Sequence, residues 1–96
     1  MRMYVEQFHN KNQFVITSKE GVAFQSYNSV VATIEKGVLT LGRHWDYSNT
    51  TRKHLYLFLD EYYYNVWSKV KNEPSIRKAI QKLIDEKQIN YDYDLQ

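Results

Sequence analysis

The densest group of chemically versatile side chains lies in residues 42–54, Gly-Arg-His-Trp-Asp-Tyr-Ser-Asn-Thr-Thr-Arg-Lys-His. This segment holds two of the chain's three histidines, one of its two tryptophans, and three basic residues beside a single acid. Imidazole can act as a base near neutral pH, cationic groups bind phosphate, and aromatic rings stack on nucleobases. The run Ser48-Asn49-Thr50-Thr51 consists of residues that cap helices, so we expect a helix to begin there.

Four interpretations of this segment are open. In the structural one, Trp45 and Tyr47 pack over the end of a sheet and Asp46 or Ser48 caps the helix. In the second, free backbone N–H groups at the helix start join the basic side chains in binding an anion or a nucleic acid. In the third, His44 or His54 acts as a base toward Ser48 or a threonine. In the fourth, the segment contacts a protein.

Tyrosine is the second conspicuous feature, with nine copies in a chain that is 16% aromatic. Tyr62, Tyr63 and Tyr64 are consecutive and cannot all face one side of a helix, so at least one should be exposed or at an interface. Tyr, Trp and Arg dominate the energetics of many protein interfaces. The predicted binding residues, for a partner or a nucleic acid, are Arg43, His44, Trp45, Tyr47, Arg52, Lys53 and Tyr63. We assign no catalytic or metal-binding residue, expect no enzymatic activity and predict no cofactor.

Composition excludes several classes of protein. The 96 residues contain no cysteine, which rules out disulfide scaffolds, thiolate zinc sites and cysteine nucleophiles. Phosphate-binding glycine loops and the commonest hydrolase and metalloprotease motifs are missing from the sequence. A net charge of +2 is too small to indicate a nucleic-acid binder. Neither an apolar run of membrane length nor a secretory segment occurs, so we expect a cytoplasmic protein with no membrane partner.

Two β-hairpins are predicted in residues 13–42. Residues 14–17, 22–27, 30–35 and 38–41 are rich in β-branched and aromatic side chains, and turn residues, including Gly21 and Gly37, separate them. Residues 1–12 are predicted to form an N-terminal arm. The sequence then changes to helical spacing, which predicts helices over residues 50–71 and 74–87, within a helical region 48–87. Residues 88–96 form an acidic, aromatic tail.

These elements predict a single α+β domain spanning residues 1–96, in the order ββββαα, with two helices packed on a four-stranded antiparallel sheet. Several strands carry apolar residues on both faces, as in Val30-Val31-Ala32. A sheet with one buried face alternates more cleanly. The second face is therefore expected to be covered by a helix, by the N-terminal arm or by another subunit, and we expect a homodimer.

A family resemblance adds context. Residues 27–32 (Tyr-Asn-Ser-Val-Val-Ala), 45–51 (Trp-Asp-Tyr-Ser-Asn-Thr-Thr) and 52–59 (Arg-Lys-His-Leu-Tyr-Leu-Phe-Leu) are similar to segments of an uncharacterised family of small proteins. Phages, plasmids and other mobile elements of low-GC Gram-positive bacteria encode those proteins. The resemblance covers about residues 21–59, and its most specific part is the run from Trp45 to His54 at the helix start.

The resemblance implies an accessory protein that binds and inhibits a host defence complex, in particular an anti-CRISPR inhibitor of a type II CRISPR effector nuclease. Many anti-CRISPR proteins are strongly acidic mimics of DNA, whereas this chain carries +2. The expected target is therefore a host protein surface or a guide–protein complex in the cytoplasm of the bacterial cell. The alternative is a small DNA- or RNA-binding accessory protein, and a nuclease or transferase that uses the histidines is a remote third.

Overall fold

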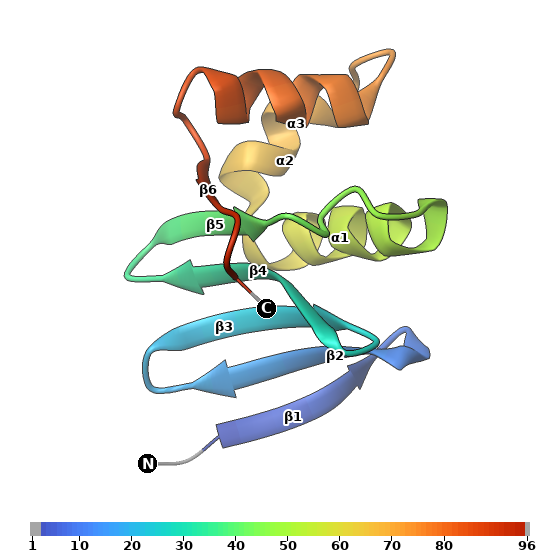
Figure 1. The fold of residues 1–96 in the computed structure, drawn as a ribbon, viewed down its shortest axis with the longest axis vertical. Coiled ribbons are helices and arrows are strands. Elements are labelled where there is room, and N and C mark those ends of the chain that lie inside the picture. The colour runs from blue at the N-terminus through green and yellow to red at the C-terminus, as the bar shows by residue number, and fades with distance from the viewer. Residues whose placement is uncertain (1–2, 96) are drawn as a thin grey trace.

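The computed structural model describes residues 3–95, which form an α+β fold with one mixed sheet of six strands and three helices (Figure 1). The strands are β1 (Met3–Phe8), β2 (Asn10–Ser18), β3 (Gly21–Ser26), β4 (Ser29–Glu35), β5 (Val38–Gly42) and β6 (Asn90–Asp92). The helices are α1 (Asn49–Tyr62), α2 (Tyr64–Val70) and α3 (Ile76–Asp85). The strands lie in the spatial order β1-β2-β3-β4-β5-β6, with every neighbouring pair antiparallel except β5 and β6.

The four predicted strands are present as β2 to β5, and the two hairpins pair as expected. The prediction of an N-terminal arm was wrong. Residues 3–8 form β1, which pairs with β2 along its whole length. His9 adopts a φ of 62°, so the chain turns there and Asn10 already belongs to the next strand. The C-terminal tail also differs from the prediction, since β6 adds a parallel strand beside β5.

Glycine occupies two of the hairpin turns, and at one of them no side chain fits. A side-chain carbon at Gly21, where φ is 152°, would lie 1.9 Å from the carbonyl oxygen of Ile34, so no other residue fits without a shift of the backbone. Lys36 and Gly37 both have positive φ, as the tight type I′ turn of a hairpin demands, and Glu35 pairs directly with Val38.

The long helix predicted over residues 50–71 is two helices. Tyr63 has φ −146° and ψ 59°, which is outside the helical region and ends α1. Its hydroxyl donates to the carbonyl oxygen of Gly37 at 2.8 Å, so a contact with the sheet compensates for the interruption. The last helix is shorter than predicted, because Ser75 is its N-cap and accepts from the backbone N–H of Lys78.

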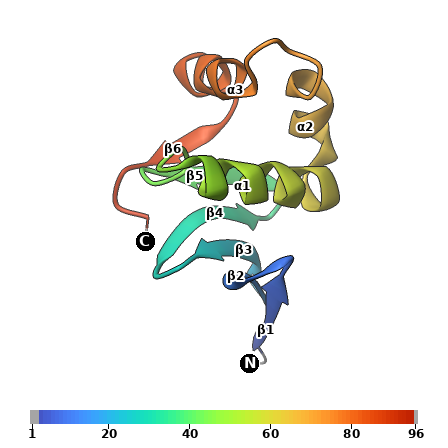
Figure 2. The same cartoon turned by 90° about the vertical axis from the view of Figure 1, so that its right-hand side faces the viewer.

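One face of the sheet is covered by α1, and α2 and α3 lie beyond the β5–β6 end of the sheet (Figure 2). Phe24 of β3 is fully buried and stacks on Phe58 of α1, with ring centroids 5.5 Å apart. Four residues that are consecutive partners across β2 to β5 share this face, and all are buried: Val15, Phe24, Ala32 and Leu41. The core continues through α2 and α3 by way of residues such as Ile80.

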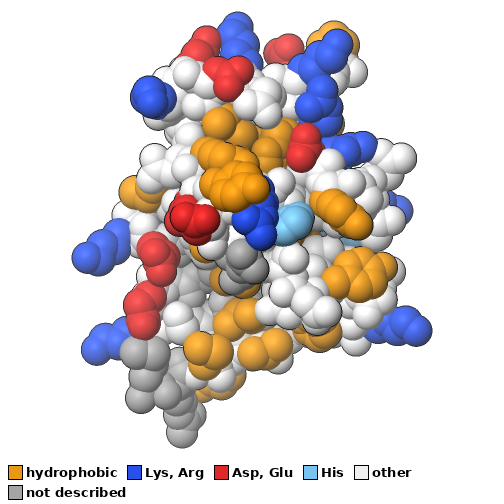
Figure 3. Space-filling view, in the orientation of Figure 1, with side chains coloured by type: hydrophobic (Ala, Val, Ile, Leu, Met, Phe, Trp, Pro, Cys, Tyr) orange, Lys and Arg blue, Asp and Glu red, His pale blue; other side chains and the backbone are white. Residues whose placement is uncertain are grey.

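The other face of the sheet carries no helix. Val5, Ile16 and Ala23 are consecutive partners on this face and are exposed or half-buried. Figure 3, which looks onto this face, shows hydrophobic side chains gathered over the strands. The segment after β6 crosses its upper part, where Leu95 lies against Gly42. None of the helices in residues 3–95 is long and apolar enough to cross a membrane.

Candidate functional site

An open pocket of about 540 Å³ lies where the β3–β4 turn meets the start of α1, at the right of Figure 1. Two stretches of chain line it, one from the end of β3 into β4 and one from the β5–α1 junction into the first turn of α1. The lining residues are Ser26, Tyr27, Asn28, Ser29, Val31, His44, Tyr47, Ser48, Thr50 and Thr51. Five of these side chains carry aliphatic hydroxyl groups, and His44 is the only basic side chain among them.

A hydroxyl network joins the two walls. Of the two predicted cap residues, Ser48 is the N-cap of α1, and its Oγ accepts from the backbone N–H of Thr51 at 3.1 Å. The same Oγ donates to Thr51 Oγ1 at 3.2 Å, and Thr51 Oγ1 lies 3.3 Å from Ser26 Oγ. Ser26 and Thr51 are both buried, so they form the inner end of the pocket and fix the helix start against β3.

The β3–β4 turn presents an aromatic ring from a constrained backbone. Tyr27 has a φ of 55°, a left-handed conformation that a tyrosine adopts only at an energetic cost. Its N–H donates to the carbonyl oxygen of Asn12 at 2.7 Å, and its own carbonyl accepts from Nε2 of Gln25 at 2.8 Å. Two neighbouring strands therefore hold the turn, while the Tyr27 side chain remains exposed.

The opposite rim consists of Tyr47 and His44. Tyr47 is 77% exposed, which is the highest value among the exposed large hydrophobic residues. Its ring meets the His44 ring edge to face, with centroids 5.8 Å apart. His44 Nε2 accepts from Nε of Arg43, with 3.4 Å between the nitrogens. The pocket thus lies between two exposed tyrosines, one on each wall.

Of the seven predicted binding residues, only His44 and Tyr47 line the pocket. Trp45, a predicted binding residue, is 2% exposed and belongs to the hydrophobic core, as in the structural interpretation, so it offers no surface to a partner. Tyr63 is half-buried and binds Gly37, whereas its neighbours Tyr62 and Tyr64 are the exposed members of the run.

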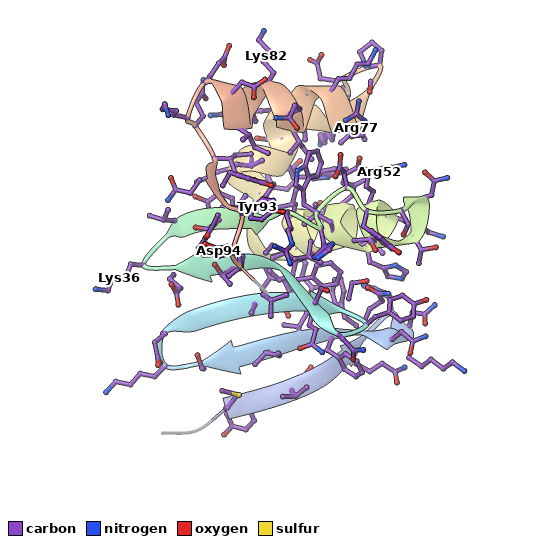
Figure 4. The ribbon with its side chains drawn as sticks, in the orientation of Figure 1. Lys36, Arg52, Arg77, Lys82, Tyr93 and Asp94 are labelled. Atoms are coloured by element: carbon purple, nitrogen blue, oxygen red, sulfur yellow. The ribbon has the colours of Figure 1, made fainter. Side chains whose placement is uncertain are left out.

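The basic residues of the junction do not converge on the pocket. Arg52 donates to the carbonyl oxygen of Asp46 at 3.0 Å and to Asn49, and Figure 4 shows it between α1 and α3 near Arg77. Arg77 in turn approaches the Asp46 carboxylate at 3.5 Å. Lys53 is exposed on α1 and does not line the pocket.

Arg43 points to the C-terminal segment instead. Its guanidinium carbon lies 4.7 Å from the centroid of the Tyr93 ring, a cation–π contact. Figure 4 shows Tyr93 on the sheet face turned toward the viewer. The predicted basic cluster is therefore divided among several contacts within the protein.

Chemistry by an activated serine finds little support in this arrangement. The Ser48 hydroxyl is engaged twice with Thr51, so its proton is directed into the helix cap and not toward His44. His54 is buried, and its Nδ1 lies 2.9 Å from the carbonyl oxygen of Thr50. Within residues 3–95, no three His, Asp or Glu side chains lie close enough together to hold a metal ion.

A buried glutamine lies behind the inner end of the pocket. Gln13 is fully buried, and neither its Oε1 nor its Nε2 has a hydrogen-bond partner among the described residues. Gln13 pairs directly with Ser26 across β2 and β3, so both side chains project from the same face. An unpaired buried amide is uncommon in folded proteins.

The predicted set of binding residues did not include the residues of the β3–β4 turn or the hydroxyl residues at the helix start. Tyr27, Asn28 and Ser29 belong to a segment that the family resemblance had singled out, and Thr50 and Thr51 belong to another. Their meeting depends on contacts between positions 25 residues apart, such as Ser26 with Thr51. The shared resemblance was the one signal in the sequence that connected them.

Comparison with known proteins places this pocket within a family. The model of a family of unknown function, DUF8033, matches residues 3–74, which include every residue of the pocket and exclude α3 and β6. No curated protein and no solved structure matched the chain. Since the match covers most of its length, the chain belongs to the DUF8033 family.

Proposed function

We propose that this protein is a non-enzymatic binding protein that holds a protein partner at the pocket between Tyr27 and Tyr47. The observation that carries the proposal is the pair of exposed tyrosine rings facing a hydroxyl-lined pocket. Tyrosine supplies a large, rigid contact area with a polar end, and serine, threonine and asparagine supply adaptable hydrogen bonds, a combination found in protein-recognition surfaces.

Charge favours a protein over a nucleic-acid backbone. The pocket lining contains neither lysine nor arginine. Arg52 and Arg43, which could reach phosphate groups, contact Asp46 and Tyr93 instead. A surface that binds nucleic acid nonspecifically neutralises several phosphates with free cationic side chains. A neutral, aromatic and hydroxyl-lined pocket matches a protein loop better.

The identity of the partner is the more specific part of the proposal. The sequence segments that resemble small phage and plasmid proteins, residues 27–32 and 45–51, form the two walls of the pocket. On that resemblance we assign the partner to a host defence complex in the bacterial cytoplasm. The most specific form of the proposal is an anti-CRISPR inhibitor of a type II effector nuclease, encoded by a phage or mobile element.

The test is a cleavage assay with the purified type II effector of a host, its guide RNA and a target DNA. Wild-type protein should inhibit cleavage, and Tyr47→Ala should weaken inhibition by at least about tenfold, as loss of an interface anchor does. Tyr64→Ala is the matched control, because Tyr64 is also exposed but lies on α2, away from the pocket. It should inhibit like the wild type.

A pull-down from host lysate, treated or untreated with nuclease, separates binding from inhibition. The proposed pocket is supported if one partner is retained after nuclease treatment, and if Tyr47→Ala loses that partner while Tyr64→Ala keeps it. This holds even if the captured partner is a defence protein other than the type II effector. Retention that needs intact nucleic acid and falls steeply with salt points to the nucleic-acid alternative. Equal retention by all three proteins would overturn the pocket as the binding site.

A further inference from the structure

The positive charge of the chain is concentrated at its helical end. Residues 64–88, which contain α2 and α3, have six Lys or Arg and three Asp or Glu side chains, a net charge of +3. Residues 1–63 have seven basic and six acidic side chains, and residues 89–96 have two acidic and no basic ones. Figure 3 shows Lys and Arg side chains protruding around α3 at the top of the molecule. The small net charge of the whole chain therefore conceals an uneven distribution.

Four lysines of this region are exposed, and their ammonium groups are unpaired within residues 3–95: Lys69, Lys78, Lys82 and Lys87. We call them the lysine surface. The neighbouring carboxylates accept from glutamines and form no ion pair with these lysines. Asp85 accepts from Nε2 of Gln81 at 3.0 Å, and Glu86 accepts from Nε2 of Gln88 at 3.1 Å. The four ammonium groups are therefore available to another molecule.

The members of the lysine surface lie close together. Lys78 and Lys82 are four positions apart on α3, so they share one helix face with about 5–6 Å between their Cβ atoms. Figure 4 shows Lys82 extending from α3 away from the rest of the protein. Lys69 of α2 and Lys82 line the same groove of about 180 Å³ between the two helices, next to Glu73 and Glu86. Flexible lysine stems from two helices can thus reach one extended ligand.

We propose that the lysine surface binds the phosphate backbone of duplex DNA without reading its sequence. A DNA duplex carries about one negative charge per 1.7 Å of its axis, and lysine binds a phosphate as a point charge. Binding is driven by release of the counterions that those phosphates hold. The lysine surface is separate from the pocket between Tyr27 and Tyr47, whose lining contains no lysine and no arginine. The protein then holds its protein partner at one site and DNA at the other.

The surroundings of the lysine surface favour a duplex over other anionic partners. The apolar side of α3 is turned inward, where Ile80 is fully buried and Ile76, Ala79 and Leu83 pack against the core. Between residues 65 and 90, all of which the structure describes, no large hydrophobic side chain is exposed. The surface thus lacks the apolar face that inserts into a lipid bilayer and the aromatic anchors of protein and single-strand recognition. A duplex backbone requires only cations.

The salt dependence of DNA binding is the first test. Binding of the whole protein to a fluorescent DNA duplex of about 20 base pairs is measured by anisotropy at about 50–200 mM NaCl. Each neutralised phosphate adds about −0.9 to the slope of log K against log [NaCl], so four lysines predict a slope of about −3.6. Arg77 and Lys71 are not counted, because Arg77 approaches Asp46 at 3.5 Å and Lys71 donates to the Tyr64 hydroxyl at 2.5 Å. The affinity should fall about a hundredfold across this range of salt.

Removal of two lysines tests the location. The α3 double variant, Lys78→Gln with Lys82→Gln, should weaken binding at low salt by at least about tenfold and halve the slope to about −1.8, because two fewer phosphates are neutralised. Lys19→Gln with Lys36→Gln is the matched control, since it removes the same charge from exposed lysines in the β2–β3 and β4–β5 turns. Figure 4 shows Lys36 at the edge of the sheet, away from Lys82. The control should bind like the wild type, and circular dichroism confirms that both variants are folded.

A slope near about −3.6 that the α3 double variant halves and the control leaves unchanged supports the proposal. Equal losses in the two double variants overturn it, because net charge alone would then explain the binding. So does the absence of duplex binding up to about 100 µM protein at the lowest salt. Tighter binding to a single strand of equal charge, or to vesicles of anionic lipid, assigns the surface to that partner and overturns the duplex. None of these measurements contains the partner of the pocket, so DNA binding and the proposed function are tested separately.

Discussion

Replacing Gln13 by methionine should stabilise the protein, although the position is fully buried. The Gln13 amide has an oxygen and a nitrogen that lack hydrogen-bond partners among the described residues. Both atoms are removed from bulk water on folding, and no protein group among the described residues replaces it as a partner. Methionine has a similar length and shape and no polar group that needs a partner, so it fills the same space without that penalty.

The magnitude follows from two opposing contributions. An unsatisfied buried polar group destabilises a protein by about 1–3 kcal/mol, which the substitution removes. A volume-conserving change in a core costs less than about 1.5 kcal/mol in repacking. The net expectation is a gain of about 1 kcal/mol, which for a domain of this size raises the melting temperature by about 4–8 °C.

Thermal and urea denaturation of the wild type and Gln13→Met measure this gain. Gln25→Met is the control, because it is the same change on the adjacent strand β3, on the opposite face of the sheet. Gln25 donates to the carbonyl of Tyr27 at 2.8 Å, so its replacement should destabilise by about 0.5–1.5 kcal/mol. Opposite signs for the two substitutions support the reasoning. A loss of stability in Gln13→Met would refute it, since the amide would then be hydrogen-bonded in solution.

Four further substitutions test the fold and its junction. Ser48→Ala should lower the unfolding free energy by about 1 kcal/mol in urea titrations, because the N–H of Thr51 loses its capping acceptor. Trp45→Ala should lower it by about 3–5 kcal/mol, since the ring is core, and a smaller loss would show that the ring is not buried in solution. Gly21→Ala should destabilise by more than about 1 kcal/mol, because the added carbon meets the backbone of β4. Burial raises the pKa of Tyr56, so the folded state holds that proton more tightly than the unfolded state. The contribution of the protonated Tyr56 hydroxyl to stability is complete below pH about 10 and is lost as the pH rises further. Above pH about 10, the melting temperature of Tyr56→Phe should therefore fall less steeply with pH than that of the wild type.

Local signals in the sequence were sufficient for the hairpins. The turns at Gly21 and Gly37 need backbone conformations that glycine adopts freely, and the flanking runs have β-branched and aromatic side chains. The same local reasoning failed for β1. Asn10 and Asn12 are typical of turns, yet both lie within β2, where pairing with neighbouring strands outweighs their preference.

The helix start was predictable and the pocket was not. Ser48 caps α1 through a bond to a residue three positions away, which residue types alone indicate. The other wall of the pocket comes from the β3–β4 turn, and only the folded chain brings Ser26 to Thr51. The direction of the side chains between β5 and α1 could not be predicted either, because the turns there have no repeating period. Trp45 therefore points into the core while Tyr47, two residues later, points into solvent.

Two departures from ordinary stability rules lie side by side at this pocket. Tyr27 has a left-handed backbone at its rim, and Gln13, next to Ser26 at its inner end, is buried with no hydrogen-bond partner for its amide in the described part of the chain. The turn that carries Tyr27 is also hydrogen-bonded to the strand that carries Gln13, because the N–H of Tyr27 donates to the carbonyl oxygen of Asn12. Natural sequences break local rules mainly where function requires it and compensate elsewhere. Stability gained by Gln13→Met should then be accompanied by weaker partner binding, which is the trade-off expected of a residue retained for a site and not for the fold.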